Sequence, residues 1–180
     1  CLVIIETTVP PGTCNKVILP IIEKIFLKRK IDKDKVKLAH SYERVMPGPH
    51  YLDSIINNWR VYSANNTNAS KICQKFLKSF LNTKQFPLTK LSSMTASETA
   101  KIIENSYRAT NIAFIEEWAR FSERVGINAF EIIDAIRKRP THNNIRQPGF
   151  GVGGYCLTKD PYFGSVASNQ LFNLKKLIFP

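Results

Sequence analysis

The sequence predicts an α/β protein in which a parallel sheet is followed by one long helix and a mainly α-helical region. Short apolar, β-prone segments alternate with helical segments up to about residue 91, which is typical of right-handed crossovers between parallel strands. An uninterrupted helical pattern then runs from Thr95 to Gly126. A hydrophobic content of 43% in 180 residues is sufficient for a real core.

The first strand is predicted in "LVIIETTVPPG", an apolar run that ends in a Pro-Gly turn. A helix capped by Thr13 should follow to about Lys30, although Pro20 must kink or split it. Further strands are expected in "VKLAH", "RVYSAN" and "KQFPLTKL". An amphipathic helix is expected in "NASKICQKFLKSFLN".

The long helix has clear predicted ends. Thr95 and Glu98 have the spacing of a capping box, and Gly126 suits the left-handed position after the last turn. About 30 residues at 1.5 Å each span about 45 Å, more than one sheet needs. Its apolar residues extend more than halfway round, so we expect it to pack on two sides, between domains or between subunits.

Two shorter helices are predicted after the long one. One should run from a cap at Asn128 to about Arg139, and the other should start at Asp160 with Pro161 at its first position. Between them lies "PTHNNIRQPGFGVGGYCLTK", an irregular stretch rich in glycine and amide side chains. Loops of this length tend to be functional or disordered, and we favour function here.

Composition excludes several classes of protein. The net charge of +12 is scattered along the chain, apart from "KIFLKRKIDKDK", which favours a solvated surface over a nucleic-acid interface. There is no apolar run long enough to predict a membrane span, and "CLVII" is followed by Glu6 rather than by a cleavage site. The four cysteines are widely spaced, which predicts neither a zinc site nor a disulfide framework and indicates the reducing cytoplasm.

Cys156 is the candidate nucleophile. It is predicted to lie about four residues before a helix N-terminus, with Lys159 nearby, and both conditions favour a thiolate. Gly151, Gly153 and Gly154 leave room for a substrate to approach the backbone. A buried structural cysteine beside a tight turn explains the same local features, so both interpretations stay open at this point.

Lys101 and Asn105 are the candidate partners of this cysteine. They are four positions apart on the long helix and therefore share a face. Apolar neighbours such as Ile102, Ile103 and Tyr107 predict a largely buried turn, in which a lysine and an asparagine need partners. A positive charge and an amide donor could together stabilise the oxyanion of a tetrahedral intermediate, whereas the ordinary alternative is a solvated polar face.

Four segments carry a resemblance to a known family: "ETTVPPGT", "SYERVMPG", "TASETAKIIENSYRATNIAFIEEWA" and "QPGFGVGGYCLTKDP". In this order they resemble the nucleotide-sugar 6-dehydrogenases, which act on UDP-glucose, UDP-N-acetylhexosamines or GDP-mannose. The resemblance covers nearly the whole chain. It implies oxidation of the C6 primary alcohol of a nucleotide-linked sugar to a carboxylate, with two NAD and no metal.

The resemblance also implies roles for individual residues. Cys156 would attack the intermediate aldehyde to give a thiohemiacetal, which is oxidised to a thioester and hydrolysed. Lys101 and Asn105 match the residues that stabilise the oxyanions, and Asp160 matches the acid that helps to position water and lysine. Thr8 matches the threonine that orders the water, and Glu43 matches the glutamate of a "PE" motif that here reads Tyr42-Glu43. Together with Lys159, these two residues would contact NAD.

The same resemblance implies a sugar-binding loop, which comprises Asn143, Asn144, Gly149, Phe150, Gly151, Gly153 and Gly154. His142 lies next to this loop, where we expect a contact rather than a base. Pro47 stands where UDP-glucose dehydrogenases often carry a second glutamate, which favours N-acetylated or related sugars. Thr158 replaces a common proline after the cysteine, which should change loop rigidity more than chemistry.

By resemblance, residues 1–92 would be the C-terminal part of a Rossmann-like NAD-binding domain, and residues 93–180 a central helical domain that makes homodimers through the long helix. The family begins with a G-x-G-x-x-G half, for which the glycines at 151–154 are no substitute because they follow no predicted strand. It also ends with a third domain that grips the nucleotide. We therefore expect a piece of a longer enzyme that has no turnover alone.

Two alternatives remain beside this interpretation. One is a dimerisation module without catalysis. The other is a β-hydroxyacid dehydrogenase of the 6-phosphogluconate type, which uses a lysine and no cysteine nucleophile.

Overall fold

The computed structural model describes residues 1–174 and divides them into two compact units. The first unit comprises residues 1–102 together with the described residues from Phe163 onward, and the second comprises residues 103–162. The helix α4 (Met94–Val125) is continuous from one unit into the other. The α/β class, with part of a Rossmann-like sheet, a long helix and a helical region, is confirmed.

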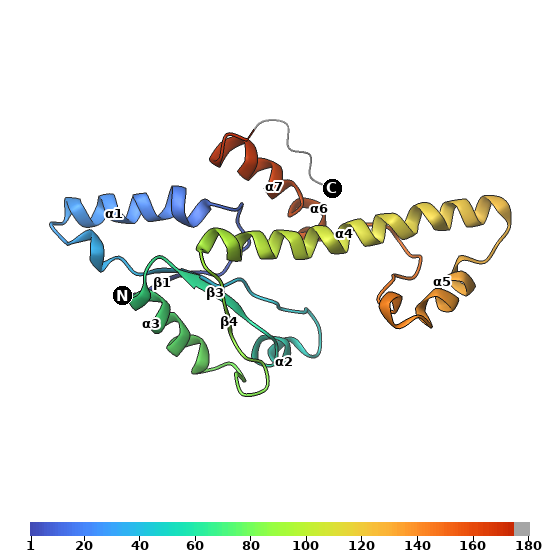
Figure 1. Cartoon of the computed structure of the whole chain (residues 1–180), viewed down its shortest axis with the longest axis horizontal. Helices are drawn as coiled ribbons and strands as arrows, with labels where there is room; N and C mark the ends of the chain where they lie inside the picture. The colour runs from blue at the N-terminus through green and yellow to red at the C-terminus, as the bar shows by residue number, and fades with distance from the viewer. Residues whose placement is uncertain (175–180) are drawn as a thin grey trace. The chain divides into compact units, whose positions relative to one another are not determined.

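The first unit is built on a four-stranded sheet in the order β1-β2-β3-β4 (Figure 1). Its strands are β1 (Val3–Ile5), β2 (Leu38–His40), β3 (Val61–Ala64) and β4 (Thr89–Lys90). The pairs β1–β2 and β3–β4 are parallel as predicted, but β2 and β3 are antiparallel. The connection between them holds only the short helix α2 (Tyr51–Ile56), so the chain returns in the opposite direction instead of crossing over.

The two faces of this sheet are covered by different helices (Figure 1). Side chains alternate along β2, so Ala39 packs in a cluster with Cys73 and Leu77 of α3 (Thr67–Lys78), while Leu38 packs with Cys14 and Met94 on the other face. The helix α3 begins at the cap Asn66, whose side chain accepts a hydrogen bond from Ala69 N–H.

The segment after β1 forms a split helix, as Pro20 predicts. A π-helical turn η1 (Cys14–Ile18) is followed by α1 (Leu19–Lys28), with Pro20 in the first turn of α1. Gly12 precedes η1 with φ +92°, and a Cβ there would lie 2.7 Å from the ring of Phe172. This position therefore requires glycine. The remaining helical segments of this unit are η2 (Lys33–Lys35), most of α7 (Tyr162–Val166) and η4 (Ala167–Leu171).

The predicted capping box at the start of α4 is wrong. Ser93 caps the helix instead, because its hydroxyl accepts a hydrogen bond from Ala96 N–H at 3.1 Å. Glu98 is fully buried and accepts from the backbone N–H groups of Gly12 and Cys14. The C-terminal prediction is confirmed, since Gly126 follows the helix with φ 75°.

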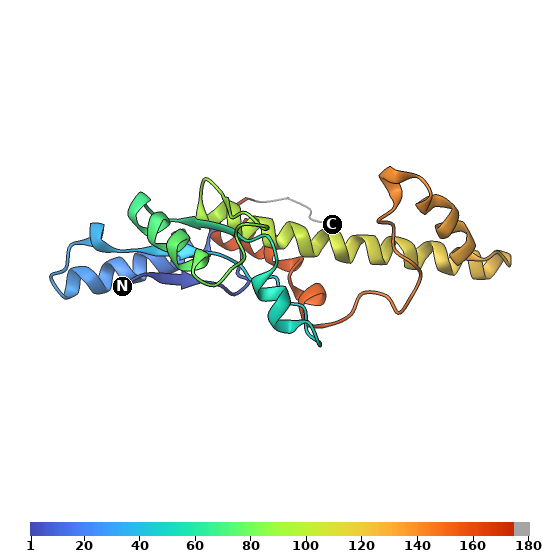
Figure 2. The same ribbon diagram turned by 90° about the horizontal axis from the view of Figure 1, so that it is seen from below.

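In the second unit, α5 (Ala129–Arg137) folds back beside the C-terminal half of α4 in both ribbon views (Figures 1 and 2). Asn128 caps it as predicted, accepting from Phe130 and Glu131 N–H. The chain continues through η3 (Pro140–His142) and the glycine-rich loop to α6 (Tyr155–Lys159). Within residues 1–174, we find no helix that combines the length and apolarity needed to cross a membrane.

Candidate functional site

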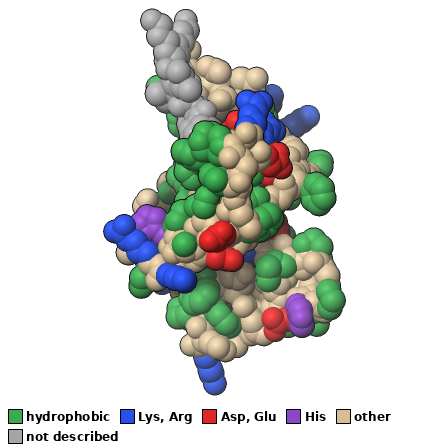
Figure 3. All heavy atoms as spheres, turned by 90° about the vertical axis from the view of Figure 1, so that its right-hand side faces the viewer, with side chains coloured by type: hydrophobic (Ala, Val, Ile, Leu, Met, Phe, Trp, Pro, Cys, Tyr) green, Lys and Arg blue, Asp and Glu red, His purple; other side chains and the backbone are tan. Residues whose placement is uncertain are grey.

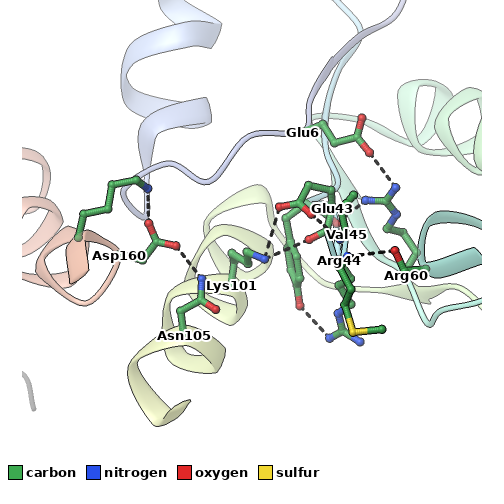
Figure 4. Close-up of polar contacts among 12 residues, drawn as sticks. Glu6, Glu43, Arg44, Val45, Arg60, Lys101, Asn105 and Asp160 are labelled. Carbon is green, nitrogen blue, oxygen red and sulfur yellow. Dashed lines mark hydrogen bonds and ion pairs between the residues drawn. The ribbon is translucent and has the colours of Figure 1, made fainter. Parts of the chain in front are cut away.

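Lys101 is held by Glu43 in the first unit. Its side chain is almost buried, with the residue 8% exposed. Nζ donates a hydrogen bond to the main-chain oxygen of Glu43 at 3.1 Å and lies 3.7 Å from Glu43 Oε1 (Figure 4). The ring centroid of Tyr42 lies 5.5 Å from the same nitrogen, within cation–π range. The buried charge is therefore compensated from several directions, as a buried lysine requires.

The segment that carries Glu43 is fixed by a residue that sequence reasoning missed. Arg60, 4% exposed, donates to the main-chain oxygen of Tyr42 at 2.7 Å and forms an ion pair with Glu6 at 2.8 Å (Figure 4). Glu43 also accepts from Val45 N–H at 2.6 Å through Oε2. The only sequence signal for this role was an arginine at the first position of the predicted strand "RVYSAN".

Thr8 and Glu43 follow the carboxyl ends of two neighbouring strands, β1 and β2, and therefore lie at the same edge of the sheet. Ile5 at the end of β1 is paired in parallel with His40 at the end of β2, and each candidate residue comes three positions later. Both side chains are half-buried. The carboxyl ends of neighbouring parallel strands are the usual place for a nucleotide ligand in α/β proteins.

Asn105, Asp160 and Lys159 come together in the second unit. Asn105 is 2% exposed and Asp160 is fully buried. Asn105 Nδ2 donates to Asp160 Oδ2 at 2.6 Å, and Lys159 Nζ forms an ion pair with Asp160 Oδ1 (Figure 4). Lys159 also lies 4.8 Å from the ring centroid of Tyr155. One carboxylate thus holds an amide and a cation, the arrangement that a buried charge needs.

Cys156 is exposed and lies inside α6. The prediction that a helix starts at Asp160 is wrong, because Asp160 is the C-terminal cap of α6 and α7 begins only at Tyr162. Asp160 N–H donates to the main-chain oxygen of Cys156 at 3.0 Å, so the cysteine lies one helical turn before the buried acid. Gly154, with φ 79°, allows the chain to enter this turn.

The glycine-rich loop is anchored on α4 within the second unit. Asn144 Nδ2 donates to the hydroxyl of Tyr107 at 3.0 Å, and Gly149 N–H donates to Glu116 Oε1 at 3.3 Å. Gly151 has a φ of 59°, which favours glycine, and a Cβ there would make an ordinary contact of 3.8 Å with the carboxylate of Glu116. Phe150 is fully exposed, and Asn143, Gly153 and Gly154 are also exposed.

The predicted site residues thus form two groups, each within one unit. Lys101 joins Glu43, and Asn105 joins Asp160 and Lys159. The prediction of a buried turn holds for Lys101, Ile102 and Asn105, whereas Ile103 and Tyr107 are more than half exposed. Glu116 and Tyr107, which hold the loop, carried no signal in the sequence beyond their place on the long helix.

Beneath this sheet edge, His40 is fully buried and its burial lowers the pKa from 6.5 to about 4. Between pH 6.5 and about pH 4, His40 is therefore protonated in the unfolded chain but not in the folded chain. The free energy of unfolding consequently decreases as the pH falls from 6.5 to about 4. We expect a loss of about 3 kcal/mol in the free energy of unfolding from this residue alone.

Urea unfolding of the parent and His40→Gln at about pH 7 and about pH 4.5 checks this expectation. The variant should lose less stability on acidification than the parent, and His142→Gln, which changes an exposed histidine, should behave like the parent. Equal acid sensitivity in all three proteins would show that His40 does not titrate as described.

The chain is similar to known proteins in both sequence and fold. A model of the UDP-glucose/GDP-mannose dehydrogenase family, central domain, matches residues 95–175. The UDP-N-acetyl-D-mannosamine dehydrogenase of Methanocaldococcus jannaschii is 36% identical over 90% of this chain and 34% of its own length. The NDP-N-acetyl-D-galactosaminuronic acid dehydrogenase of Ralstonia solanacearum is 30% identical over 90% of this chain and 38% of its own.

A solved structure, UDP-D-ManNAc dehydrogenase from Pyrococcus horikoshii, superposes with a TM-score of 0.81 at 32% identity. It covers 99% of this chain, which in turn covers 39% of that protein. The chain spans between 34% and 40% of the length of the curated relatives it matches. The chain belongs to the UDP-glucose/GDP-mannose dehydrogenase family.

Proposed function

We propose that this chain is part of an enzyme that oxidises the C6 primary alcohol of a nucleotide-linked sugar to a carboxylate. In this proposal residues 1–92 are the C-terminal part of an NAD-binding domain, and residues 93–180 are a central domain that carries the nucleophile Cys156. The observation that carries the proposal is the buried Asp160, which binds Asn105 and Lys159 one helical turn after Cys156.

The residues at the sheet edge fit an NAD site. Thr8 and Glu43 follow the paired ends of β1 and β2, and both are half-buried and so partly open to a ligand. NAD, when bound, would accept one hydride in each of the two oxidations. Lys159 is the third proposed contact to the cofactor.

Each remaining candidate has a chemical task in this proposal. The Cys156 sulfur attacks the aldehyde carbon, and the resulting thiohemiacetal is oxidised to a thioester that water cleaves. Lys101 and Asn105 stabilise the negative oxygen of the tetrahedral intermediates. Asp160 positions the attacking water and a lysine, and Thr8 orders that water.

The substrate is proposed to be a UDP-sugar of the N-acetylhexosamine or glucose type. Two kinds of relative are named for N-acetylated sugars, and Pro47 replaces a glutamate that UDP-glucose dehydrogenases often carry. The sugar would lie on Asn143, Asn144 and residues 149–154, most of which offer backbone or amide groups. The proposed compartment is the cytoplasm.

A panel of UDP- and GDP-sugars with NAD tests the proposal, with the sugar acid measured by mass spectrometry. The assay uses a longer polypeptide in which this chain lies between a G-x-G-x-x-G dinucleotide-binding half and a C-terminal nucleotide-binding domain, and the 180-residue chain alone should give no acid. An N-acetylated UDP-sugar should be oxidised fastest. If no sugar of the panel gives its acid in the longer polypeptide, the proposed reaction is wrong.

We also propose that the chain forms a homodimer through α4. Phe114, Trp118 and Phe121 on this helix are each about half exposed and stack edge to face, with centroids 5.7 and 6.5 Å apart. The same three side chains help to line an apolar pocket of about 450 Å³, most of whose lining residues belong to α4 and α5. Figure 3 views the molecule from the end where these helices lie and shows hydrophobic side chains on the surface. An apolar surface of this kind marks an interaction site.

Analytical ultracentrifugation checks the dimer. Trp118→Glu places a charge in the proposed interface and should raise the dimer Kd at least about 30-fold, the effect expected of an aromatic hot spot. The control is Phe76→Glu, which changes an equally exposed aromatic residue on α3 and should leave the Kd unchanged. A parent chain that stays monomeric at high concentration would rule out this dimer and with it the interpretation as a dimerisation module.

A further inference from the structure

Two adjacent polar side chains near the start of α4 are completely buried. Ser97 and Glu98 each have an exposed fraction of 0%. The carboxylate of Glu98 accepts two backbone hydrogen bonds, from Gly12 N–H at 2.6 Å and from Cys14 N–H at 2.7 Å. These donors lie at the start of η1, where N–H groups have no partner inside the helix. Glu98 therefore ties the segment between β1 and η1 to α4.

Ser97 makes the equivalent connection to the middle of the sheet. Its hydroxyl is hydrogen-bonded to Nδ1 of His40 at the end of β2, and it lies 2.9 Å from the hydroxyl of Ser63 in β3. His40 and Ser63 are also fully buried and are register partners in the antiparallel pair. The Ser97–Glu98 pair thus contacts three separate segments of the first unit.

Two of these three segments, the one after β1 and the one after β2, carry the candidate residues of the sheet edge. Thr8 precedes Gly12 by four positions, and Glu43 follows His40 by three. Lys101, which binds Glu43, comes one helical turn after Ser97 and Glu98 and so lies on the same side of α4. A shift of α4 against the sheet would separate Lys101 from Glu43.

We propose that Ser97 and Glu98 are positioning residues, which fix α4 against the sheet so that Lys101 meets Glu43 and the segment bearing Thr8 keeps its place. The catalytic meaning of this contact rests on the function proposed above, but the contact itself does not. Hydrogen bonds from two N–H groups to a buried carboxylate are strong because one partner is charged and water is excluded. Burial also raises the pKa of Glu98, so this carboxylate depends on those two donors.

A glutamine at position 98 tests the proposal with little change of shape. Its side chain offers one acceptor oxygen, whereas Gly12 and Cys14 present two donors, so one N–H is left facing an NH₂ group. We expect Glu98→Gln to speed backbone amide exchange in a peptide spanning residues 10–16 by about tenfold or more in the 180-residue chain. Exchange in α3, which packs on the other face of the sheet, should not change.

Acylation of Lys101 by an amine-selective reagent measures how far this lysine is held in its buried position. The extent of modification is determined by peptide mass spectrometry. The lysine is almost buried in the parent chain, so both Glu98→Gln and Ser97→Ala should raise its modification several-fold while Cys73 stays protected from alkylation. Glu117→Gln is the control, because Glu117 is an exposed glutamate of the same helix that forms an ion pair with exposed Arg120.

The proposal is overturned if Lys101 modification is unchanged in both variants, or if amide exchange rises equally in α3, which would indicate general destabilisation. In the longer polypeptide, each variant should lower kcat more than it raises KM. If that polypeptide oxidises no sugar at all, the proposed reaction fails, whereas amide exchange and Lys101 acylation still decide the positioning role.

Discussion

Replacement of Cys156 by serine should stop formation of the sugar acid. A serine hydroxyl is a far weaker nucleophile than a thiol at neutral pH and gives no thioester, so the rate of acid formation should fall by at least about 1000-fold. The side chain is exposed at the start of α6, and the fold should tolerate the change. Mass spectrometry of the products in the longer polypeptide measures the effect.

Cys1→Ser is the matched control, because Cys1 is the other exposed cysteine. It should keep the parent rate. If Cys156→Ser forms acid as fast as the parent, the cysteine mechanism is wrong. Oxidation that needs Lys101 but not Cys156 would instead favour the β-hydroxyacid dehydrogenase of the 6-phosphogluconate type.

Replacement of Lys101 by methionine should lower kcat by about 100- to 1000-fold, the cost of removing one oxyanion-stabilising group. Methionine fills much of the space of the lysine stem but brings no charge, so Glu43 also loses its buried cation at 3.7 Å. Steady-state kinetics with NAD and the preferred sugar measure this loss. Lys71→Met, on the exposed side of α3, is the control and should have no effect.

A kcat within about threefold of the parent would show that Lys101 has no part in the chemistry, since this corresponds to less than about 0.7 kcal/mol. The lysine would then be only a structural partner of Glu43. Circular dichroism of both variants separates this outcome from loss of folding.

Most of the elements could be predicted from local patterns. Pro20 splits the first helix, Gly126 ends the long helix, and Asn128 caps α5, because each residue acts on its own few neighbours. Apolar neighbours also predicted that Lys101 and Asn105 are buried, although Ile103 and Tyr107 among those neighbours are exposed. The family followed from four ordered segments rather than from any single residue.

Other features could not be predicted, because they depend on distant contacts. Thr95 and Glu98 have the spacing of a capping box, but the carboxylate of Glu98 binds the turn after β1, more than 80 positions away in sequence. The Asp-Pro pair at 160–161 resembles a helix start, yet Asp160 ends α6 and is buried against Asn105. Arg60 and Glu116 act on backbone groups that only the fold brings to them.

The ratio of NADH formed to nucleotide sugar consumed tests the central claim most directly. Oxidation of an alcohol to an acid removes four electrons, so the proposed thioester route predicts two NADH for each sugar, with the acid as the only product. A ratio of one, with an aldehyde or ketone as the product, would contradict the two-step oxidation and the role of Cys156 in it.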